Sequence, residues 1–233
     1  MSSSIADNLA WVNERIRQAE HRAGRPENSV RLVGVTKNRT VEQIEAAVAA
    51  GLVDIGENRF QEAAEKFPRL KSEITFTRHF IGHLQRNKAR QVLGLFDTIQ
   101  SVDSERLALA LDGHAAGAGI RPRVLIQVNT SGEESKFGVQ PGRCENLLEV
   151  TAGLGNLELV GLMTIGPLSP DAARIKKSFN LLRNLFDRYA GMRTGNCRME
   201  ILSMGMSSDF ETAIAEGSNM VRVGTAIFGP RAE

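Results

Sequence analysis

The chain has 233 residues, of which 42% are hydrophobic and 24% are charged, a composition typical of a globular protein with a sizeable core. Its 29 basic and 27 acidic side chains nearly balance and are spread along the chain, which argues against nucleic-acid binding through a basic surface. No stretch approaches the roughly 18 uncharged apolar residues of a membrane span, so a membrane protein is not expected either.

The first predicted element is an amphipathic helix near the N-terminus. Apolar residues recur there at helical spacing, with charged residues on the opposite face: Ile5, Leu9, Val12 and Ile16. The segment does not have the basic leader and apolar core of an export signal. We therefore expect a soluble, cytoplasmic protein.

Eight short apolar runs follow this helix, and each is long enough to form a strand. They occupy residues 31–35, 51–55, 76–81, 95–100, 123–128, 157–163, 199–202 and 219–223. The segments between the runs carry helical signals, so strand and helix are predicted to alternate along the chain.

Four of these helical signals are specific enough to place the start or the end of a helix. Thr40–Gln43 and Ser208–Glu211 match the capping-box pattern, in which Thr or Ser is followed three residues later by Gln or Glu. Pro170 is expected in the first turn of a helix, and Gly217 is expected to end the helix that opens at Ser208. The helix after Pro170 has an apolar face formed by Ile175, Phe179, Leu182 and Phe186.

The alternation predicts an α/β fold with a parallel sheet, because parallel neighbours need crossover connections. Eight strand–helix units in 233 residues are close to the size of a (β/α)8 TIM barrel, about 250 residues. The alternative is an open, doubly wound nucleotide-binding sheet, but neither GxGxxG nor GxxxxGK follows any of the runs. We predict a single barrel domain over residues 1–233, with an extra N-terminal helix.

Functional residues in such a barrel lie at the carboxyl ends of the strands and in the loops that follow. Polar residues and glycines follow most of the predicted strands. They include Lys37, Asn58, His83, Asn129, Thr164, the segment 203–208, Gly224 and Thr225. The sequence therefore predicts that these residues meet at one end of the barrel.

The loops after the last two strands carry the clearest signal for an anion. Ser203, Gly205 and Ser207 lead into a helix whose first amides lack helical partners and whose dipole favours negative charge. Gly224, after the neighbouring strand, allows close approach of the backbone. The same residues could instead only cap the helix and turn the chain, so the pattern leaves a phosphate site and a structural role open.

Arg222 adds to this signal because of the alternation within its strand. Val221 and Val223 share one face, and Arg222 lies with Gly224 on the other. If the valines face the helices, the guanidinium points into the barrel. A charge there must be paired, either with an inward carboxylate or with a ligand.

Lys37 shares its strand face with Val33 and Val35, so we expect it to rise from the barrel interior into the mouth. A lysine in a partly desolvated mouth can act as a Schiff-base nucleophile, whereas an exposed lysine stays protonated. A lysine can also clamp a phosphate as a cation. Its position alone does not decide among these roles.

The histidines and cysteines predict no metal site. His79 and His83 are four residues apart, about 13 Å on a strand at ~3.3 Å per residue, which is too far for a shared metal. His79 is expected to be structural, and His83 to stack or hydrogen-bond at the strand exit. Cys144 and Cys197 lie in no ligand spacing and are expected to be reduced structural thiols.

With these residues assembled, the sequence resembles the YggS/PROSC family of pyridoxal phosphate homeostasis proteins. The resemblance extends from about Leu32 to Gly229 and is specific because the motifs keep their order and spacing. The motifs are VTK (35–37), GEN (56–58), HFIGHLQ (79–85), SVDS (101–104), QVNTSGEESKFG (127–138), GLMTI (161–165), LSMGMSSDFE (202–211) and VRVGTAIFG (221–229).

The resemblance implies a barrel of the alanine racemase N-terminal domain type, with pyridoxal 5'-phosphate (PLP) bound as an internal aldimine. The aldimine would form on Lys37, and Arg222 would face the pyridine nitrogen. The remaining implied cofactor-binding residues are Ser203, Ser207, Gly224 and Thr225 for the phosphate, and Asn58 and His83 near the cofactor. Relatives often carry tyrosine in place of Arg59 and tryptophan in place of Arg78, and both differences would change the rim of the mouth.

The residues favour a carrier over an enzyme. A PLP racemase needs a second acid/base opposite the lysine, which in racemases of this fold is a tyrosine from a C-terminal β-domain. Here the chain ends ten residues after Val223, and Tyr189, the one tyrosine, precedes the seventh strand. Arg222 has only donors to offer, so it disfavours protonation of the ring nitrogen and weakens the ring as an electron sink.

We therefore expect a monomeric protein that stores or delivers PLP without robust catalytic activity and influences amino-acid and keto-acid pools indirectly. PLP-dependent apoenzymes are the candidate acceptors. The alternative is a genuine enzyme, either a weak PLP-dependent racemase or a Schiff-base aldolase.

Overall fold

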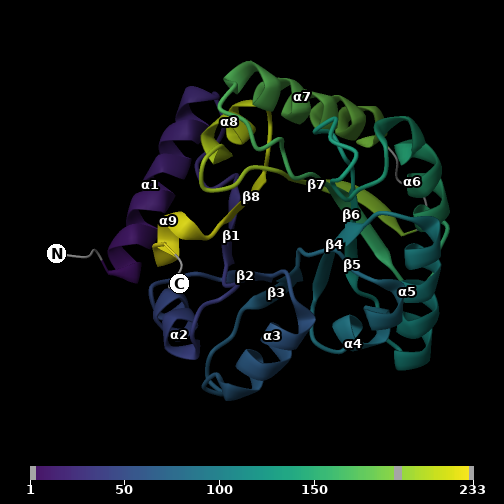
Figure 1. Ribbon diagram of the computed structural model, residues 1–233, viewed down its shortest axis with the longest axis horizontal. Coiled ribbons are helices and arrows are strands. Elements are labelled where there is room, and N and C mark those ends of the chain that lie inside the picture. The colour runs from purple at the N-terminus through teal and green to yellow at the C-terminus, as the bar shows by residue number, and fades with distance from the viewer. Residues whose placement is uncertain (1–3, 192–195, 231–233) are drawn as a thin grey trace.

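Eight parallel strands close into a barrel, and helices surround it (Figure 1). The computed structural model describes residues 4–191 and 196–230. The strands pair in chain order, and β8 closes the ring against β1. They are β1 (Arg31–Val35), β2 (Asp54–Glu57), β3 (Thr77–Phe80), β4 (Thr98–Val102), β5 (Arg123–Gln127), β6 (Glu158–Met163), β7 (Cys197–Ser203) and β8 (Met220–Val223). The predicted (β/α)8 barrel is confirmed.

Helices connect the strands and cover the outside of the barrel. The α-helices are α1 (Ile5–Arg22), α2 (Val41–Ala49), α3 (Phe60–Lys66), α4 (Ala89–Leu93), α5 (Glu105–Ala118), α6 (Cys144–Ala152), α7 (Ala172–Tyr189), α8 (Phe210–Ala215) and α9 (Thr225–Phe228). Short 3-10 helices occupy Phe67–Arg69, Arg86–Lys88 and Pro141–Arg143. The extra N-terminal helix is confirmed as α1, which packs against α2, α8 and α9.

All eight apolar runs overlap strands, but two strands start three residues later than predicted. The second starts at Asp54 because Gly51, with a φ of 99°, and Leu52 complete the turn after α2. The fourth starts at Thr98 because the amides of Leu95 and Phe96 still bond to the carbonyl of Val92 in α4. In both cases the end of a helix contributes apolar residues to the run.

The helix-start predictions have different outcomes. Thr40 and Gln43 form the predicted capping box of α2. The prediction for Pro170 is wrong, because α7 begins at Ala172 and the carboxylate of Asp171 caps it. The capping box at Ser208 is also wrong, because α8 begins at Phe210 with no side-chain cap.

The core has an inner and an outer part. Six buried side chains fill the inside of the barrel: Val33, Leu125, Val160, Met163, Ile201 and Met220. The outer part lies between strands and helices, and it includes Val221 and Val223 of β8. The predicted alternation in β8 is therefore confirmed, with the valines facing the helices and Arg222 facing inward.

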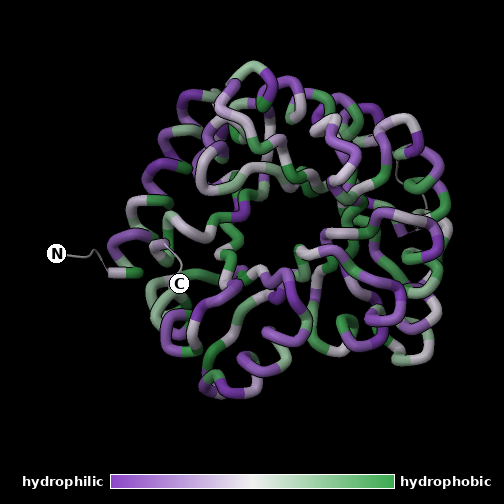
Figure 2. Tube along the Cα trace, in the orientation of Figure 1, coloured by the Kyte–Doolittle hydropathy of each residue, from purple (hydrophilic) through white to green (hydrophobic). Residues whose placement is uncertain are grey.

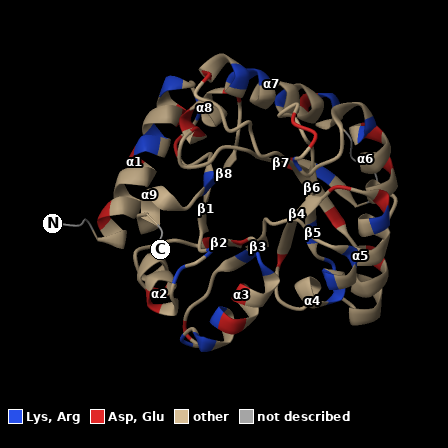
Figure 3. Ribbon diagram, viewed as in Figure 1, with Lys and Arg blue, Asp and Glu red and all other residues tan. Residues whose placement is uncertain are grey.

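The surface carries charges of both signs. Figure 3 shows acidic and basic residues mixed over the outer helices, and Figure 2 shows hydrophilic and hydrophobic residues alternating along them. No helix in the described part of the chain is long and apolar enough to cross a membrane. Cys144 and Cys197 are buried and form no disulfide, as expected.

Candidate functional site at the barrel mouth

Lys37 lies in a tight turn that directly follows β1. The amide of Arg39 donates to the carbonyl of Thr36 at 3.0 Å, and Asn38 adopts a positive φ of 57°. The amide of Asn38 also donates to the carboxylate of Glu62 at 2.9 Å. Lys37 is half-buried between the buried Thr36 and the exposed Asn38. The turn thus places Lys37 at the carboxyl end of the strands, as its strand face predicts.

A buried ion pair between Lys66 and Glu57 stabilises this turn. The ammonium of Lys66 contacts the carboxylate of Glu57 and donates to the carbonyl of Thr36 at 2.8 Å. The hydroxyl of Thr36 donates to the same carboxylate at 2.7 Å. Burial raises the pKa of Glu57, although Lys66 and Thr36 both donate hydrogen bonds to it. The residue that precedes Lys37 is therefore fixed through both its side chain and its backbone.

Arg39 ties the same turn to the end of the chain. Its guanidinium donates to the carbonyls of Phe228 and Pro230, each at 3.1 Å, and to that of Gly229. These carbonyls lie at the end of α9 and directly after it, and α9 starts next to Gly224. Arg39 thereby links the turn that carries Lys37 to the helix after β8.

Asn58 lies beside this turn, at the end of β2. It is partly buried, and its Oδ1 atom is buried and accepts no hydrogen bond from the described residues. Gly82 packs against it, and a Cβ at Gly82 would come within 2.0 Å of the Asn58 carbonyl oxygen. Only glycine allows the exits of β2 and β3 to approach this closely. The contact brings Asn58 and His83 to the same side of the mouth.

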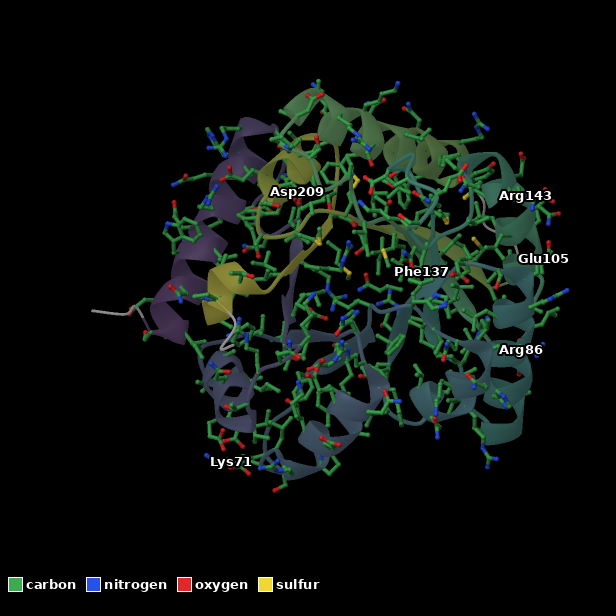
Figure 4. All side chains as sticks on the ribbon, in the orientation of Figure 1. Lys71, Arg86, Glu105, Phe137, Arg143 and Asp209 are labelled. Carbon is green, nitrogen blue, oxygen red and sulfur yellow. The ribbon has the colours of Figure 1, made fainter. Side chains whose placement is uncertain are left out.

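His83 stacks on Phe137, which comes from the loop after β5. The two ring centroids are 3.8 Å apart, and the ring planes differ by 9°. The Nδ1 atom of His83 lies 3.4 Å from the carboxylate of Asp103, whose pKa is raised by burial although His83 opposes this. In Figure 4, Phe137 lies inside the ring of helices, whereas Lys71, Glu105 and Arg143 lie near its edge. His83 thus stacks on a side chain of this protein, and its place near the cofactor stays a prediction.

The loop that carries Phe137 is anchored on two sides. Asn129 donates to the carbonyls of Glu133 and Lys136 at 2.8 and 3.0 Å, and Gln127 donates to that of Phe137 at 3.1 Å. The ammonium of Lys136 donates to the carbonyl of Gly166 at 2.9 Å, in the segment after β6. The loop 129–138 thus connects the exits of β3, β5 and β6.

The loops after β7 and β8 meet at Ser207. The amides of Gly224 and Ala226 point at its hydroxyl oxygen, at 3.3 and 3.5 Å. Gly205, with a φ of 96°, lets the first loop turn back, and a Cβ there would come within 2.6 Å of the Ala213 side chain. Thr225 is exposed at the start of α9. The hydroxyl and the amides therefore converge where the sequence predicts an anion site.

Ser203 does not lie at this junction. Its hydroxyl is fully buried, accepts from the guanidinium of Arg222 at 2.5 Å and donates to the side-chain oxygen of Gln100 at 2.7 Å. The structure thus places Ser203 beside Arg222 in the barrel interior, instead of with the phosphate loop expected from the resemblance.

Arg222 points into the barrel, as its strand face predicts. The second nitrogen of its guanidinium donates to the carbonyl of Thr164 at 2.7 Å. Burial lowers the pKa of Arg222 to about 10, although the negative charge of Asp209 opposes this. Burial also raises the pKa of Asp209, while the amide of Met206 and the charge of Arg222 act in the opposite direction. Arg222 is thus held by the neutral oxygen atoms of Ser203 and Thr164, and the charge of Asp209 also acts on it.

His79 is buried and structural, as expected. It contacts the carboxylate of Asp54 at 2.8 Å and the side-chain nitrogen of Gln100 at 3.1 Å. No group of three or more metal-ligating side chains occurs among the residues that the structure describes. Arg78, expected at the rim, lies near the amino end of β3, with its Nε atom 3.5 Å from the carboxylate of Asp97. Arg59, the other rim position, is exposed directly after Asn58.

The sequence did not predict a role for several residues that shape the site. They are Arg39, Glu57, Lys66, Gln100 and Phe137. Gln100 is a polar residue at the end of a predicted strand, and Glu57 lies two residues after one, which is a weak signal that they face the interior. Lys66 and Arg39 carry no such signal, because their partners lie on other elements.

The comparisons with known proteins agree with this geometry. The family model described as alanine racemase, N-terminal domain, matches residues 8–232. The match and the closed barrel define the class of protein, an alanine racemase-like barrel. A pyridoxal phosphate homeostasis protein from Aquifex aeolicus is 42% identical over 228 residues, which cover 98% of this chain and 99% of the relative. The protein of the same name from Escherichia coli K12 is 39% identical over 232 residues, 98% of this chain and 97% of the relative.

Within that class, the chain belongs to the family of pyridoxal phosphate homeostasis proteins. Solved structures show the same architecture. A structure described as an unknown protein from Bifidobacterium adolescentis has a TM-score of 0.91 and 43% identity, with 96% of this chain and 94% of the other covered. PipY from Synechococcus elongatus, solved with PLP bound, has a TM-score of 0.83 and 36% identity, with 97% and 100% covered.

An alanine racemase from Clostridium difficile shares the fold. Its TM-score is 0.75 at 18% identity, and the match covers 97% of this chain and 57% of the racemase. At that identity the likeness concerns the fold alone.

Proposed function

We propose that this protein binds PLP through a covalent bond to Lys37 and takes part in PLP homeostasis. The observation that carries the proposal is the position of Lys37, half-buried in a braced turn at the mouth of a barrel whose relative PipY is solved with PLP bound. PLP would supply a reactive aldehyde, and the amine of Lys37 would hold it reversibly.

The residues around Lys37 fit the other parts of this cofactor. A phosphate would be held by the hydroxyl of Ser207 and the first amides of α9 at Gly224 and Thr225, which have no partner within the helix. The buried Oδ1 of Asn58, which accepts no bond from the described residues, offers an acceptor beside Lys37. Arg222 would face the ring nitrogen with donors only.

Two residues from the resemblance have indirect roles in this proposal. Ser203 would act by holding Arg222, because its hydroxyl is already engaged in the barrel interior. His83 would border the cofactor through its stack with Phe137.

Reduction with borohydride tests the proposal directly. We expect the protein incubated with PLP and then reduced to carry one pyridoxyl group on the peptide that contains Lys37. The variant Lys37→Ala should lose the adduct and the visible absorbance while keeping its circular dichroism spectrum. Lys136→Ala is the matched control, because Lys136 is a second lysine at the same end of the barrel and should not be needed for the adduct. An adduct on Lys136 in the wild type, or none, would overturn the proposal.

We further propose that the protein stores or delivers PLP and has no robust turnover of its own. Tyr189 is buried at the end of α7, in the core outside the barrel, so it cannot act as a second acid/base at the mouth. Exchange of the α-proton of amino acids in deuterated water tests this. We expect no exchange above that of free PLP, whereas stereospecific exchange that depends on Lys37 would support a weak racemase instead.

Delivery has its own test. We expect a PLP-dependent apoenzyme to gain activity when mixed with the loaded protein but not with the Lys37→Ala variant.

We also propose that the protein is monomeric and that it is located in the cytoplasm. The two buried free thiols of Cys144 and Cys197 are consistent with that location.

A further inference from the structure

A continuous line of buried hydrogen bonds runs through the barrel interior from Arg222 to Asp54. The contacts are Arg222 to Ser203 at 2.5 Å, Ser203 to Gln100 at 2.7 Å, Gln100 to His79 at 3.1 Å and His79 to Asp54 at 2.8 Å. All five side chains are at most 3% exposed. The line connects β8, β7, β4, β3 and β2 across the barrel interior.

The direction of every hydrogen bond in this line is determined. A guanidinium only donates, so the hydroxyl of Ser203 accepts from Arg222 and gives its own proton to the Oε1 atom of Gln100. The amide nitrogen of Gln100 also only donates, so the Nδ1 atom of His79 must accept from it. The proton of the neutral imidazole is then on Nε2 and is donated to Asp54.

Each end of the line is held by a charge. Arg31 anchors Asp54 with two hydrogen bonds, of 2.6 and 3.3 Å. At the other end, Arg222 also donates to the carbonyl of Thr164, so its guanidinium is held on two sides. Asp209 is the carboxylate whose charge acts on Arg222 from the loop before α8. All donors in the line point from the cation toward Asp54, so reversing Ser203, Gln100 or His79 breaks two bonds.

We infer that Gln100 and His79 are positioning residues that fix the orientation of the Arg222 guanidinium toward the ring of the bound cofactor. The inference rests on the proposed function and extends it to two residues that would not touch the cofactor. His79 sets the direction of the Gln100 amide, Gln100 sets the direction of the Ser203 hydroxyl, and Ser203 then presents only lone pairs to Arg222.

The orientation of the Arg222 guanidinium affects the protonation of the ring nitrogen of the cofactor. A guanidinium held in place offers that nitrogen donors and a positive charge, and both disfavour its protonation. A guanidinium released from Ser203 can move away, which removes this effect. The line therefore keeps the ring nitrogen unprotonated and the cofactor a poor electron sink.

The test replaces Gln100 with a side chain of similar length and no hydrogen-bonding groups, Gln100→Met. In the loaded protein with 15N-labelled PLP, the pH midpoint for protonation of the ring nitrogen should rise by about one unit, a tenfold change in proton affinity. The dissociation constant for PLP should rise about tenfold. Ser203→Ala should give the same changes, and the double variant should give little more than either single variant, because both interrupt one line.

Thr98→Val is the matched control. Thr98 lies on the same strand as Gln100, is fully buried, and its hydroxyl has no partner among the described residues. This variant removes a buried hydroxyl from β4 and leaves the line intact, so the nitrogen midpoint and the dissociation constant should stay within twofold of the wild type.

A measurement without cofactor separates this inference from the proposed function. In the 15N spectrum of histidine-labelled apoprotein, His79 should show a protonated Nε2 and an unprotonated Nδ1. In Gln100→Met the Nδ1 signal should shift, because its donor is gone.

The outcomes are distinct. If the wild type forms no adduct on Lys37, the proposed function fails whatever the tautomer of His79. If the wild type binds PLP but Gln100→Met and Ser203→Ala, both folded, leave the ring-nitrogen midpoint unchanged, the inference is overturned. A proton on Nδ1 of His79 in the apoprotein overturns it as well.

Discussion

The imidazole of His83 lies flat against the phenyl ring of Phe137, with the ring centroids 3.8 Å apart. The two residues come from different loops, after β3 and after β5, and Phe137 is 56% exposed. Through this contact the loop 129–138 packs against the loop after β3, across the mouth of the barrel. Aromatic pairs contribute about 0.5–1.5 kcal/mol beyond the area they bury.

If the protein binds PLP at Lys37 as proposed, Phe137→Ala should speed the release of bound PLP. Loss of the stack frees the tip of the loop, so opening of the mouth needs less energy, and we expect release to be about 2–10-fold faster. Stopped-flow absorbance with an excess of an apoenzyme as acceptor measures the rate. Leu168→Ala is the control, because Leu168 is 92% exposed in the segment after β6 and should leave the rate unchanged. Equal rates for wild type and Phe137→Ala would show that the stack does not restrain the loop.

The buried pair of Glu57 and Lys66 gives a prediction about stability. Lys66→Met leaves the carboxylate of Glu57 buried without its cation, so the free energy of unfolding should fall by about 3–5 kcal/mol. The double variant Glu57→Gln, Lys66→Met should recover part of this loss, because no unpaired charge remains. Urea denaturation followed by circular dichroism measures each value.

A surface lysine provides the comparison for that pair. The ammonium of Lys71 lies 3.4 Å from Glu45, but its side chain is 64% exposed. Lys71→Met should therefore change the free energy of unfolding by no more than about 0.5 kcal/mol. Similar losses for Lys66→Met and Lys71→Met would contradict a special role for the buried pair.

The parts of this fold that depend on local pattern could be predicted from the sequence. Each apolar run overlaps a strand because strands of a parallel barrel are buried on both faces. The inward direction of Arg222 follows from the alternation in β8, and the capping box at Thr40 from a spacing of three residues. These features need no knowledge of distant contacts.

The parts that failed depend on competition between neighbours. Pro170 does not open α7, because Asp171, one residue later, offers a carboxylate that accepts from two amides of the first turn. The box at Ser208 does not form, because the carboxylate of Asp209 accepts from Met206 and Glu211 pairs with Arg15 of α1. A pattern of residue types cannot rank such alternatives.

The interior of the site could not be predicted for a different reason. Gln100 bonds to Ser203, 103 positions away, and Arg39 bonds to carbonyls about 190 positions away. No spacing in the sequence links residues at such separations. The family resemblance named Lys37, Arg222 and Ser203, but only the closed barrel shows that Ser203 bonds to Arg222 and that Lys66 and Arg39 hold the turn that carries Lys37.

The lowered pKa of Asp54 predicts how the free energy of unfolding changes in acid. Burial alone would raise its pKa, but the hydrogen bond from His79 and the guanidinium of Arg31 outweigh this and lower the pKa below the ordinary value of 3.8. The folded state then binds fewer protons here than the unfolded state. The stabilisation is present above the ordinary value and is lost as the pH falls through the lowered one.

We expect the free energy of unfolding to decrease as the pH falls from about 5 to about 2, with a shallower slope for Asp54→Asn. Urea denaturation at several pH values measures both slopes. Asp187→Asn is a control, because Asp187 is exposed on α7 and its side chain pairs only with Arg183 of the same helix among the described residues. Identical slopes for wild type and Asp54→Asn would show that Asp54 does not contribute to acid sensitivity.

The hydrogen bonds of Arg39 predict that the turn that carries Lys37 and the phosphate loops depend on each other for their positions. One guanidinium bonds to the carbonyls of Phe228, Gly229 and Pro230, and a lysine ammonium has no planar fork with which to reach all three. Arg39→Lys should lower the free energy of unfolding by about 1–3 kcal/mol, since hydrogen bonds to a charged group are lost.

The same variant should weaken PLP binding. Because the turn and the start of α9 would no longer be held at a fixed separation, we expect a dissociation constant about 5–10-fold higher, or about 1–1.4 kcal/mol. Arg17→Lys is the matched control, since Arg17 is exposed on α1 and pairs only with Glu14 of the same helix among the described residues. Absorbance titration of the apoproteins with PLP measures the affinities. A loss of stability in Arg39→Lys with unchanged affinity would mean that Arg39 stabilises the fold without positioning Lys37 relative to the phosphate loops.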